Sequence, residues 1–391
     1  MKPPHVLITT DTWGGVWTFT LELAYQLRRK NWTVTLACLG KPPDVEKQKK
    51  LAAWKVEFHS AEWRLEWMPE SRSEVEKTRD WLRELVRSTS PDLLHANQFC
   101  AIGSGHSGRE LLTVHSDVIS WWRQVRGEAA PDDAYHGWYL QLGQTALRQA
   151  ARVTAPSRAA AEDTLRSFGL QREIFSIPNG LSPAFFHPYL EKQNYALAAG
   201  RWWDAGKQMS WLAEQDWPLP LALAGADAAP GMRPVNSRVC ARNQLLGELD
   251  QRQMRQWLGH AAAMVSASRY EPFGLTALEA AFSRCLLVLS DLPSQRELWG
   301  EHALYFPAPG AEGARAGLER HLAWRQACPD AARARAHGAW RHALRHFTGE
   351  RMAERYMALY RKMLSPPRLS SGPMRPVPNA PEIANQPSAA A

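Results

Sequence analysis

The stretch Ser266-Ala-Ser-Arg-Tyr-Glu-Pro-Phe-Gly-Leu-Thr-Ala-Leu-Glu279 decides most of what the sequence predicts. The apolar run 261–265 before it is typical of a short buried strand, and the residues from Leu275 onward indicate a helix that follows a Pro-Phe-Gly turn. We therefore expect Glu271 in a strand-to-helix loop and Glu279 about a turn and a half inside the helix. The unpaired N–H groups at the start of this helix form a ready site for an anion.

Two carboxylates beside an anion site suit a ligand that carries both hydroxyl groups and phosphates. Carboxylates accept hydrogen bonds from sugar hydroxyls, and the backbone amides at about 274–276 bind a diphosphate. A nucleotide-sugar combines these groups. The alternative is a capped amphipathic helix whose two glutamates simply face the solvent.

At these residues the chain resembles a known protein family. Glu271 and Glu279 form an E-x7-E pair around Pro-Phe-Gly, and Ser-Asp-Leu-Pro-Ser-Gln-Arg-Glu follows at 290–297. This combination is similar to the donor-site signature of retaining GT-B glycosyltransferases, especially glycosyltransferase family 4 (glycosyl transferases group 1). The resemblance covers about residues 5–363. It implies an α/β fold in which two Rossmann-like, doubly wound domains face each other across a central cleft.

The resemblance also implies roles for single residues. Glu271 would hold hydroxyls of the donor sugar and act in catalysis, while Glu279 would bind the ribose. The turn and helix start between them would complete this part of the donor site, with Phe273, Gly274, Leu275 and Thr276. The implied reaction transfers a hexose-type sugar from a nucleotide diphosphate to an acceptor, with retention of the anomeric configuration.

A pair of glycines follows the first predicted strand, at 5–10. Gly14 and Gly15 open a helix that runs to about Arg29, and glycines at the carboxyl end of a first strand let the backbone approach a ligand closely. A plain tight turn is the alternative. In the family that the chain resembles, a Gly-Gly-Val loop at this place lies beside the donor phosphates and the acceptor.

Two cations follow the strand predicted at 195–199, in Gly200-Arg-Trp-Trp-Asp-Ala-Gly-Lys207. Arg201 offers a planar fork and Lys207 a mobile point charge, and both would stabilise charge on a leaving nucleotide diphosphate. Two solvated surface cations are the alternative. The segment resembles the Gly-Arg…Lys element of the family, which clamps the diphosphate, so we expect no metal ion and no other cofactor.

His115 ends the strand predicted at 111–115, where the loop at a carboxyl end is expected to carry function. A lone histidine is more often a structural residue. In the family, however, a histidine after the corresponding strand reaches the donor sugar near the reacting carbon, so His115 is the second candidate catalytic residue.

The chain departs from the family after Glu279. Arg284 and Leu286 stand where relatives usually have a glycine and then a proline. The larger residues must repack a turn that glycine makes easily. They leave open a second function from another class, a catalytically silent nucleotide-sugar-binding subunit that supports a partner.

The length of 391 residues and the alternation of strands and helices predict two domains. The expected parts are an acceptor-side domain at 1–180 joined by a crossing helix at about 350–364, a linker at 181–192, a donor domain at 193–349 and a disordered tail at 365–391. From 311 to 346 the chain reads as helical and rich in Arg and His. The tail is predicted from its Pro, Ser and Ala content.

Charge and cysteine content limit which partners and which cellular compartment we expect for the protein. The net charge of +8 indicates an anionic partner, and the five scattered cysteines indicate neither a disulfide framework nor a zinc site. With no signal peptide and no membrane-spanning run, we expect a cytoplasmic protein. Its expected partners are a nucleotide-sugar donor and a glycan, lipid-linked or small-molecule acceptor, with no specific nucleic acid.

A peripheral contact with the inner face of the membrane is also considered. Basic residues at 28–30 and 47–55 are interleaved with Trp32 and Trp54 in the acceptor-side domain. If they share a face, they would hold the domain against anionic lipid. A solvated basic face without a lipid role is the alternative.

Overall fold

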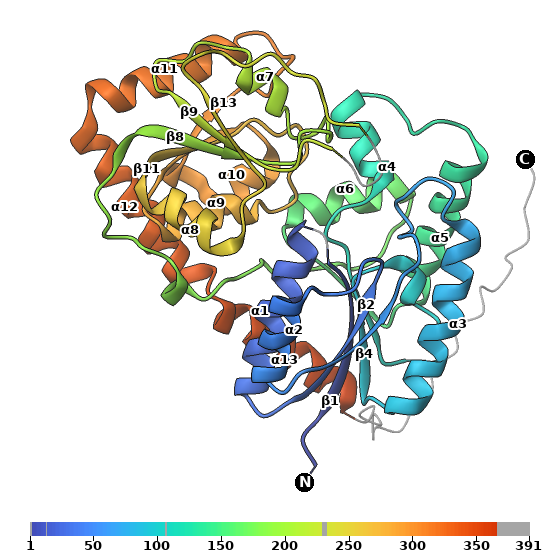
Figure 1. Cartoon of the computed structure of the whole chain (residues 1–391). Coiled ribbons are helices and arrows are strands. Elements are labelled where there is room, and N and C mark those ends of the chain that lie inside the picture. Colours follow the sequence, from blue (N-terminus) through green and yellow to red (C-terminus); the bar gives the residue numbers. More distant parts are fainter. Residues whose placement is uncertain (1, 13, 106–107, 229–232, 366–391) are drawn as a thin grey trace, which may run out of the picture.

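The computed structural model describes residues 2–12, 14–105, 108–228 and 233–365 and consists of two parallel sheets, each covered by helices (Figure 1). We call the parts around the first and second sheets the N-terminal half and the C-terminal half. The predicted tail at 365–391 lies outside the described residues except for Ser365.

The first sheet has the strand order β3-β2-β1-β4-β5-β6-β7, and all of its pairs are parallel. Its strands are β1 (His5–Asp11), β2 (Thr33–Leu39), β3 (Glu57–Ala61), β4 (Leu93–Ala96), β5 (Glu110–Thr113), β6 (Arg152–Ala155) and β7 (Phe175–Ser176). Chain order reverses between β1 and β4. The carboxyl ends of these strands therefore flank the place where open α/β sheets bind ligands.

The second sheet repeats this topology with the order β10-β9-β8-β11-β12-β13, again all parallel. Its strands are β8 (Gln193–Ala199), β9 (Leu221–Ala224), β10 (Gln244–Gly247), β11 (Ala261–Ser266), β12 (Leu286–Ser290) and β13 (Leu304–Phe306). The reversal here lies between β8 and β11. Loops after these two strands contain Arg201, Lys207 and Glu271, so the topology brings the predicted donor residues to one edge.

Helices cover both faces of each sheet, as the apolar strands require. In the N-terminal half they are α1 (Gly14–Arg29), α2 (Val45–Ala53), α3 (Arg72–Thr89), η1 (Phe99–Ala101), α4 (Val118–Trp121), the π-helical η2 (Trp122–Arg126), α5 (Ala134–Gln149) and α6 (Arg158–Phe168). The linker and the C-terminal half contain η3 (Pro183–Phe185), α7 (Met209–Ala213), α8 (Gln251–His260), α9 (Leu275–Phe282), α10 (Pro293–Trp299), η4 (Gly300–His302), α11 (Ala314–Ala327) and α12 (Pro329–His346). The helical stretch predicted at 311–346 is thus divided at Cys328, because a proline cannot continue a preceding helix.

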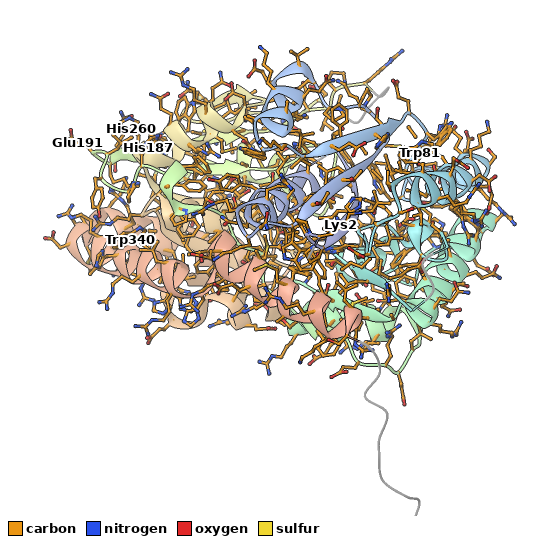
Figure 2. All side chains as sticks on the ribbon, turned by 90° about the horizontal axis from the view of Figure 1, so that it is seen from below. Lys2, Trp81, His187, Glu191, His260 and Trp340 are labelled. Atoms are coloured by element: carbon orange, nitrogen blue, oxygen red, sulfur yellow. The ribbon has the colours of Figure 1, made fainter. Side chains whose placement is uncertain are left out.

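The last helix, α13 (Gly349–Leu364), returns to the N-terminal half and packs on α1. Its buried Tyr356 and Tyr360 belong to the same core cluster as Val6 and Leu23. In the view from below, α12 lies along the C-terminal half and α13 continues along the N-terminal half (Figure 2). The start of α13 lies beside the linker, since Leu181 and Thr348 form a β-bridge.

Packing interactions accommodate Arg284 at the position where relatives usually have a glycine. Arg284 has φ 57°, in the left-handed region where glycine costs least. Its guanidinium carbon lies 5.7 Å from the centre of the Tyr189 ring and 5.6 Å from that of Trp340, so it joins the linker to α12. Leu286 is buried as the first residue of β12.

The predicted basic and aromatic surface of the N-terminal half is only partly present. Trp32 is 2% exposed and belongs to the core, so it does not meet the condition that it share a surface with the basic residues. Lys30 pairs with Glu350 at 2.7 Å and Lys47 with Asp44 at 3.0 Å, which neutralises part of the charge. No helix among the described residues is long and apolar enough to cross a lipid bilayer.

Candidate functional site

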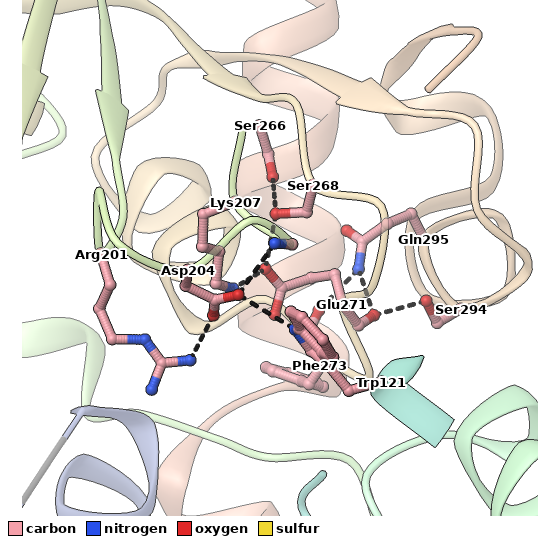
Figure 3. A network of polar contacts seen from close by, with 11 residues as sticks. Trp121, Arg201, Asp204, Lys207, Ser266, Ser268, Glu271, Phe273, Ser294 and Gln295 are labelled. Carbon is pink, nitrogen blue, oxygen red and sulfur yellow. Dashed lines mark hydrogen bonds and ion pairs between the residues drawn. The ribbon is translucent and has the colours of Figure 1, made fainter. Parts of the chain in front are cut away.

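The start of α10 holds the loop that carries Glu271 in place. The Ser294 hydroxyl donates to the Glu271 carbonyl at 2.6 Å, and the Gln295 amide donates to the carbonyls of Glu271 at 3.3 Å and Phe273 at 3.0 Å (Figure 3). Gly274 ends the loop with φ 86°, and a Cβ there would lie 3.3 Å from Glu271 Cγ. A glycine is therefore needed for both the turn and the close approach.

The Glu271 side chain pairs with a predicted cation from a neighbouring loop. Lys207 Nζ lies 2.7 Å from Glu271 Oε2, and the Ser268 hydroxyl donates to the same oxygen at 3.3 Å. The two charged side chains are 23% and 17% exposed, so water screens this pair less than a surface pair. Without a donor, the carboxylate is thus the counter-ion of Lys207.

Asp204 is a second centre of this network, and sequence reasoning did not single it out. Its carboxylate accepts from Arg201 at 2.6 Å, from the Gly206 N–H at 2.9 Å and from the Trp121 indole at 3.0 Å (Figure 3). Burial alone would raise the pKa of Asp204, but the charges of Arg201 and Lys207, together with the hydrogen bonds from Gly206 and Trp121, lower that pKa. Its position in the sequence between Arg201 and Lys207 was a signal that could have identified Asp204.

Trp121 belongs to α4 in the N-terminal half, whereas Asp204 belongs to the C-terminal half. The indole hydrogen bond therefore couples the position of Arg201 to the opposite half. The sequence contained no sign of this contact, because 83 residues separate the two partners.

The predicted glycine loop lies opposite the start of α9. A Cβ on Gly15 would lie 3.2 Å from Leu275 Cδ1, across the two halves, and Gly14 has φ 56° with open space beside it. Ala277 and Leu278 both donate to the Gly274 carbonyl. Within the described ranges, the N–H groups of Leu275 and Thr276 donate no hydrogen bond, as an anion site at a helix start requires.

Glu279 lies in the second turn of α9 and does not touch Glu271. Burial raises the pKa of Glu279 to about 7, although the nearby Arg255 of α8 opposes this. Arg255 is also attracted to Glu22 of α1, so one cation serves carboxylates from both halves. Sequence reasoning missed Arg255, which no motif marks.

His115 is held separately in the N-terminal half. Its Nε2 lies 3.0 Å from Asn97 Oδ1, while the Asn97 amide donates to the Thr9 carbonyl at 2.7 Å and to the Thr20 hydroxyl at 3.2 Å. Asn97 therefore turns its oxygen toward the ring, and Nε2 carries the proton. Burial lowers the pKa of His115 to about 3, so the ring is neutral near pH 7.

The structure thus brings Arg201, Lys207 and Glu271 together but leaves His115 apart. Among the contacts of the described residues, none joins His115 to Glu271 or Lys207. Asn97 was missed, although its place directly after β4 at the point of strand reversal was a usable signal.

Direct contacts join the two halves beside the donor residues. The Glu297 carboxylate of α10 accepts from the N–H groups of Arg158 at 2.8 Å and Ala159 at 2.9 Å, and so caps α6 from the other half. The hydroxyl of Ser157, which is the N-cap residue of α6, donates to the Pro272 carbonyl at 2.8 Å. The loop that carries Glu271 is therefore bonded to both halves.

The sequence matches the family Glycosyltransferase Family 4 over residues 13–185 and the family Glycosyl transferases group 1 over residues 195–323. A comparison with curated protein sequences gave no match.

Solved structures share the architecture over nearly the whole chain. Sucrose-phosphate synthase from Thermosynechococcus elongatus is 20% identical with a TM-score of 0.72, covering 92% of this chain and 99% of its own. Anabaena HepE in complex with UDP and glucose is 14% identical with a TM-score of 0.67, covering 92% and 100%. A glycosyltransferase from Rickettsia africae is 15% identical with a TM-score of 0.64, covering 93% and 99%. At these identities the likeness shows the fold, and the predicted α/β GT-B architecture is confirmed. Because the two family matches cover both sheets in turn, the chain belongs to the family 4 (group 1) glycosyltransferases.

Proposed function

We propose that the protein transfers a hexose-type sugar from a nucleotide diphosphate to an acceptor, with retention of the anomeric configuration. The observation that supports this is the convergence of Arg201, Lys207 and Glu271 at the start of α9. Two cations match a diphosphate, and the carboxylate matches sugar hydroxyls. Members of the same fold have been solved with UDP-glucose, as in Anabaena HepE.

The Lys207–Glu271 pair implies that the two side chains would exchange partners when the donor binds. A donor phosphate would replace Glu271 as the partner of Lys207, and the freed carboxylate would accept hydrogen bonds from the sugar. The N–H groups of Leu275 and Thr276 would bind phosphate oxygens. Arg201 and Lys207 then supply the positive charge that a metal ion supplies in other transferases, so we propose metal-independent transfer without a further cofactor.

The remaining predicted residues would contact other parts of the donor. Glu279 would accept hydrogen bonds from the ribose, and Gly14 and Gly15 would allow the backbone of the N-terminal half to approach the phosphates. His115 would approach the donor sugar as a neutral ring, with Nδ1 as an acceptor. We propose that an oxygen of the departing phosphate takes the proton that the acceptor loses.

The acceptor is expected on the N-terminal half, as a glycan, a lipid-linked compound or a small molecule. We place the reaction in the cytoplasm. Peripheral contact with the inner face of the membrane would rest on basic residues such as Arg29, Lys50 and Lys55, which form no ion pair with another described residue. Vesicle co-sedimentation tests that contact, which should need anionic lipid and weaken with salt. Absence of binding at low salt favours a soluble acceptor.

Incubation with UDP-glucose, followed by proton NMR, tests the reaction directly. We expect release of UDP and a glucose product that first appears in the α configuration of the donor. A first product with β configuration would contradict retention. Tight UDP-glucose binding with neither hydrolysis nor transfer to any acceptor would instead favour the catalytically silent subunit.

A further inference from the structure

A separate cavity lies in the N-terminal half, between the turn from α5 to β6 and the turn from α6 to β7. Its volume is about 320 Å³. Both turns precede their strands, so the cavity lies at the amino ends of β6 and β7. The loops with the predicted donor residues follow the carboxyl ends of strands, at the opposite edge of a sheet from such a cavity, and the cavity shares no residue with them. Its lining includes Arg148, Arg152, Leu170, Arg172, Glu173 and Phe175.

Positive charge exceeds negative charge in the lining of this cavity. Three arginines face one glutamate, and within the described residues none of the three forms an ion pair. Arg152 donates to the Ala151 carbonyl at 2.8 Å and Arg172 to the Ala150 carbonyl at 3.2 Å. These two bonds cap the carboxyl end of the α5 segment but leave the charges unpaired.

Arg172 experiences both burial and the charge of a neighbouring arginine. Its Nε is buried, and among the described residues it has no hydrogen-bond partner. A buried donor without an acceptor costs free energy, and so does the proximity of like charges. Burial and the nearby Arg152 both lower the pKa of Arg172, which is the direction that repulsion gives. An anion in the cavity would relieve the repulsion between Arg152 and Arg172.

We propose that this cavity binds the phosphate group of a phosphate monoester. Guanidinium groups match phosphate oxygens in paired hydrogen bonds, and three cations suit a dianion better than the single charge of a carboxylate. Leu170 and Phe175 give an apolar wall for the carbon part of the ligand. The volume suits a small phosphorylated compound or the head group of phosphatidic acid, which present the same chemistry. This site is independent of the proposed sugar transfer.

Calorimetry of the full chain with glycerol phosphate tests the site. Arg148→Gln combined with Arg152→Gln changes two exposed side chains, so the variant should fold, as an unchanged melting temperature would show. We expect it to bind glycerol phosphate at least about tenfold more weakly, from the loss of charge-assisted hydrogen bonds. Glu173→Gln removes the one acidic group of the lining and should strengthen binding several-fold.

Lys207→Gln is the matched control, because it removes a cation of the donor network and should leave glycerol phosphate binding unchanged. Binding that survives the double arginine variant, or that is lost in Lys207→Gln, would overturn the proposal. Vesicles of phosphatidylcholine with phosphatidic acid or with phosphatidylglycerol distinguish the two sources. Preference for phosphatidic acid that the double variant removes assigns a lipid, whereas glycerol phosphate binding without that preference assigns a free metabolite.

Discussion

Glu271 has two partners in succession in this account, Lys207 before the donor binds and the sugar afterwards. Glu271→Gln keeps the shape of the side chain but removes its charge. We expect turnover to fall on the order of 10²-fold, as for the loss of one preorganised electrostatic contact. The free energy of unfolding should change by less than about 1 kcal/mol, because both partners are partly exposed. Steady-state kinetics and urea unfolding measure the two effects, and activity within threefold of wild type would remove Glu271 from the site.

Glu279 should make donor binding depend on pH. Its pKa is raised from 4.5 to about 7, so much of it is protonated near neutral pH in the free protein. A carboxylate accepts ribose hydrogen bonds better than a carboxylic acid does, so affinity for a nucleotide-sugar should rise between about pH 6 and pH 8. Calorimetry at several pH values measures this rise. In Glu279→Gln the rise should be absent, and a persistent rise would assign it to another group.

The raised pKa of Glu279 also makes folding stability depend on pH, and this stability falls where donor affinity rises. The folded protein binds this proton more tightly than the unfolded chain does. The contribution of Glu279 is therefore fully present below about pH 4.5 and is lost as the pH rises through about 7.

At the scale of elements, the contact between α6 and α10 joins the two halves. Glu297→Ala removes the carboxylate that caps α6 and should favour separation of the halves by about 1 kcal/mol, or about fivefold in population. Small-angle scattering without donor should then give a larger radius of gyration than for wild type. Asp291→Ala is the control, because Asp291 pairs with Arg296 of the same half. An equal effect of both variants would mean that the cap does not hold the halves together.

The elements themselves were largely predictable from local patterns. The apolar run at 261–265 became β11, and the residues after the Pro-Phe-Gly turn became α9, because period and turn chemistry act within a few residues. The break at Cys328 was missed, since helical composition continues on both sides and Pro329 also begins a helix. The burial of Trp32 stayed open because a tryptophan between basic residues gives no sign of which side is buried.

For the candidate site, sequence motifs identified the residues that would bind the donor but not the residues that position them. Arg201, Lys207 and Glu271 stand in recognisable segments, and in the structure Lys207 pairs with Glu271 while Arg201 pairs with Asp204. The bond from Trp121 to Asp204 and the attraction of Arg255 to Glu22 act across long sequence separations. Such contacts depend on how two halves dock, which no local pattern encodes.

At the scale of the whole molecule, the N-terminal half completes a site that the C-terminal half carries. The bond from Trp121 to Asp204 and the approach of Gly15 to Leu275 both cross between the halves. Arg201 and Lys207 should make a metal unnecessary, so chelation with EDTA should leave sugar transfer largely intact. Complete loss of activity with EDTA, restored by Mg²⁺ or Mn²⁺, would show that the two cations are insufficient.

The central claim is that Arg201 and Lys207 bind the diphosphate of a nucleotide-sugar. Thermal shift with a panel of nucleoside diphosphates first identifies the base, since a ligand at a hundred times its Kd stabilises by about 2.7 kcal/mol. The decisive measurement is then the Kd of that diphosphate and of its nucleoside for wild type, Arg201→Ala and Lys207→Ala. We predict that each variant weakens diphosphate binding by about 1.5–3 kcal/mol and leaves nucleoside binding almost unchanged. Equal losses for both ligands, or no loss for either, would contradict the account.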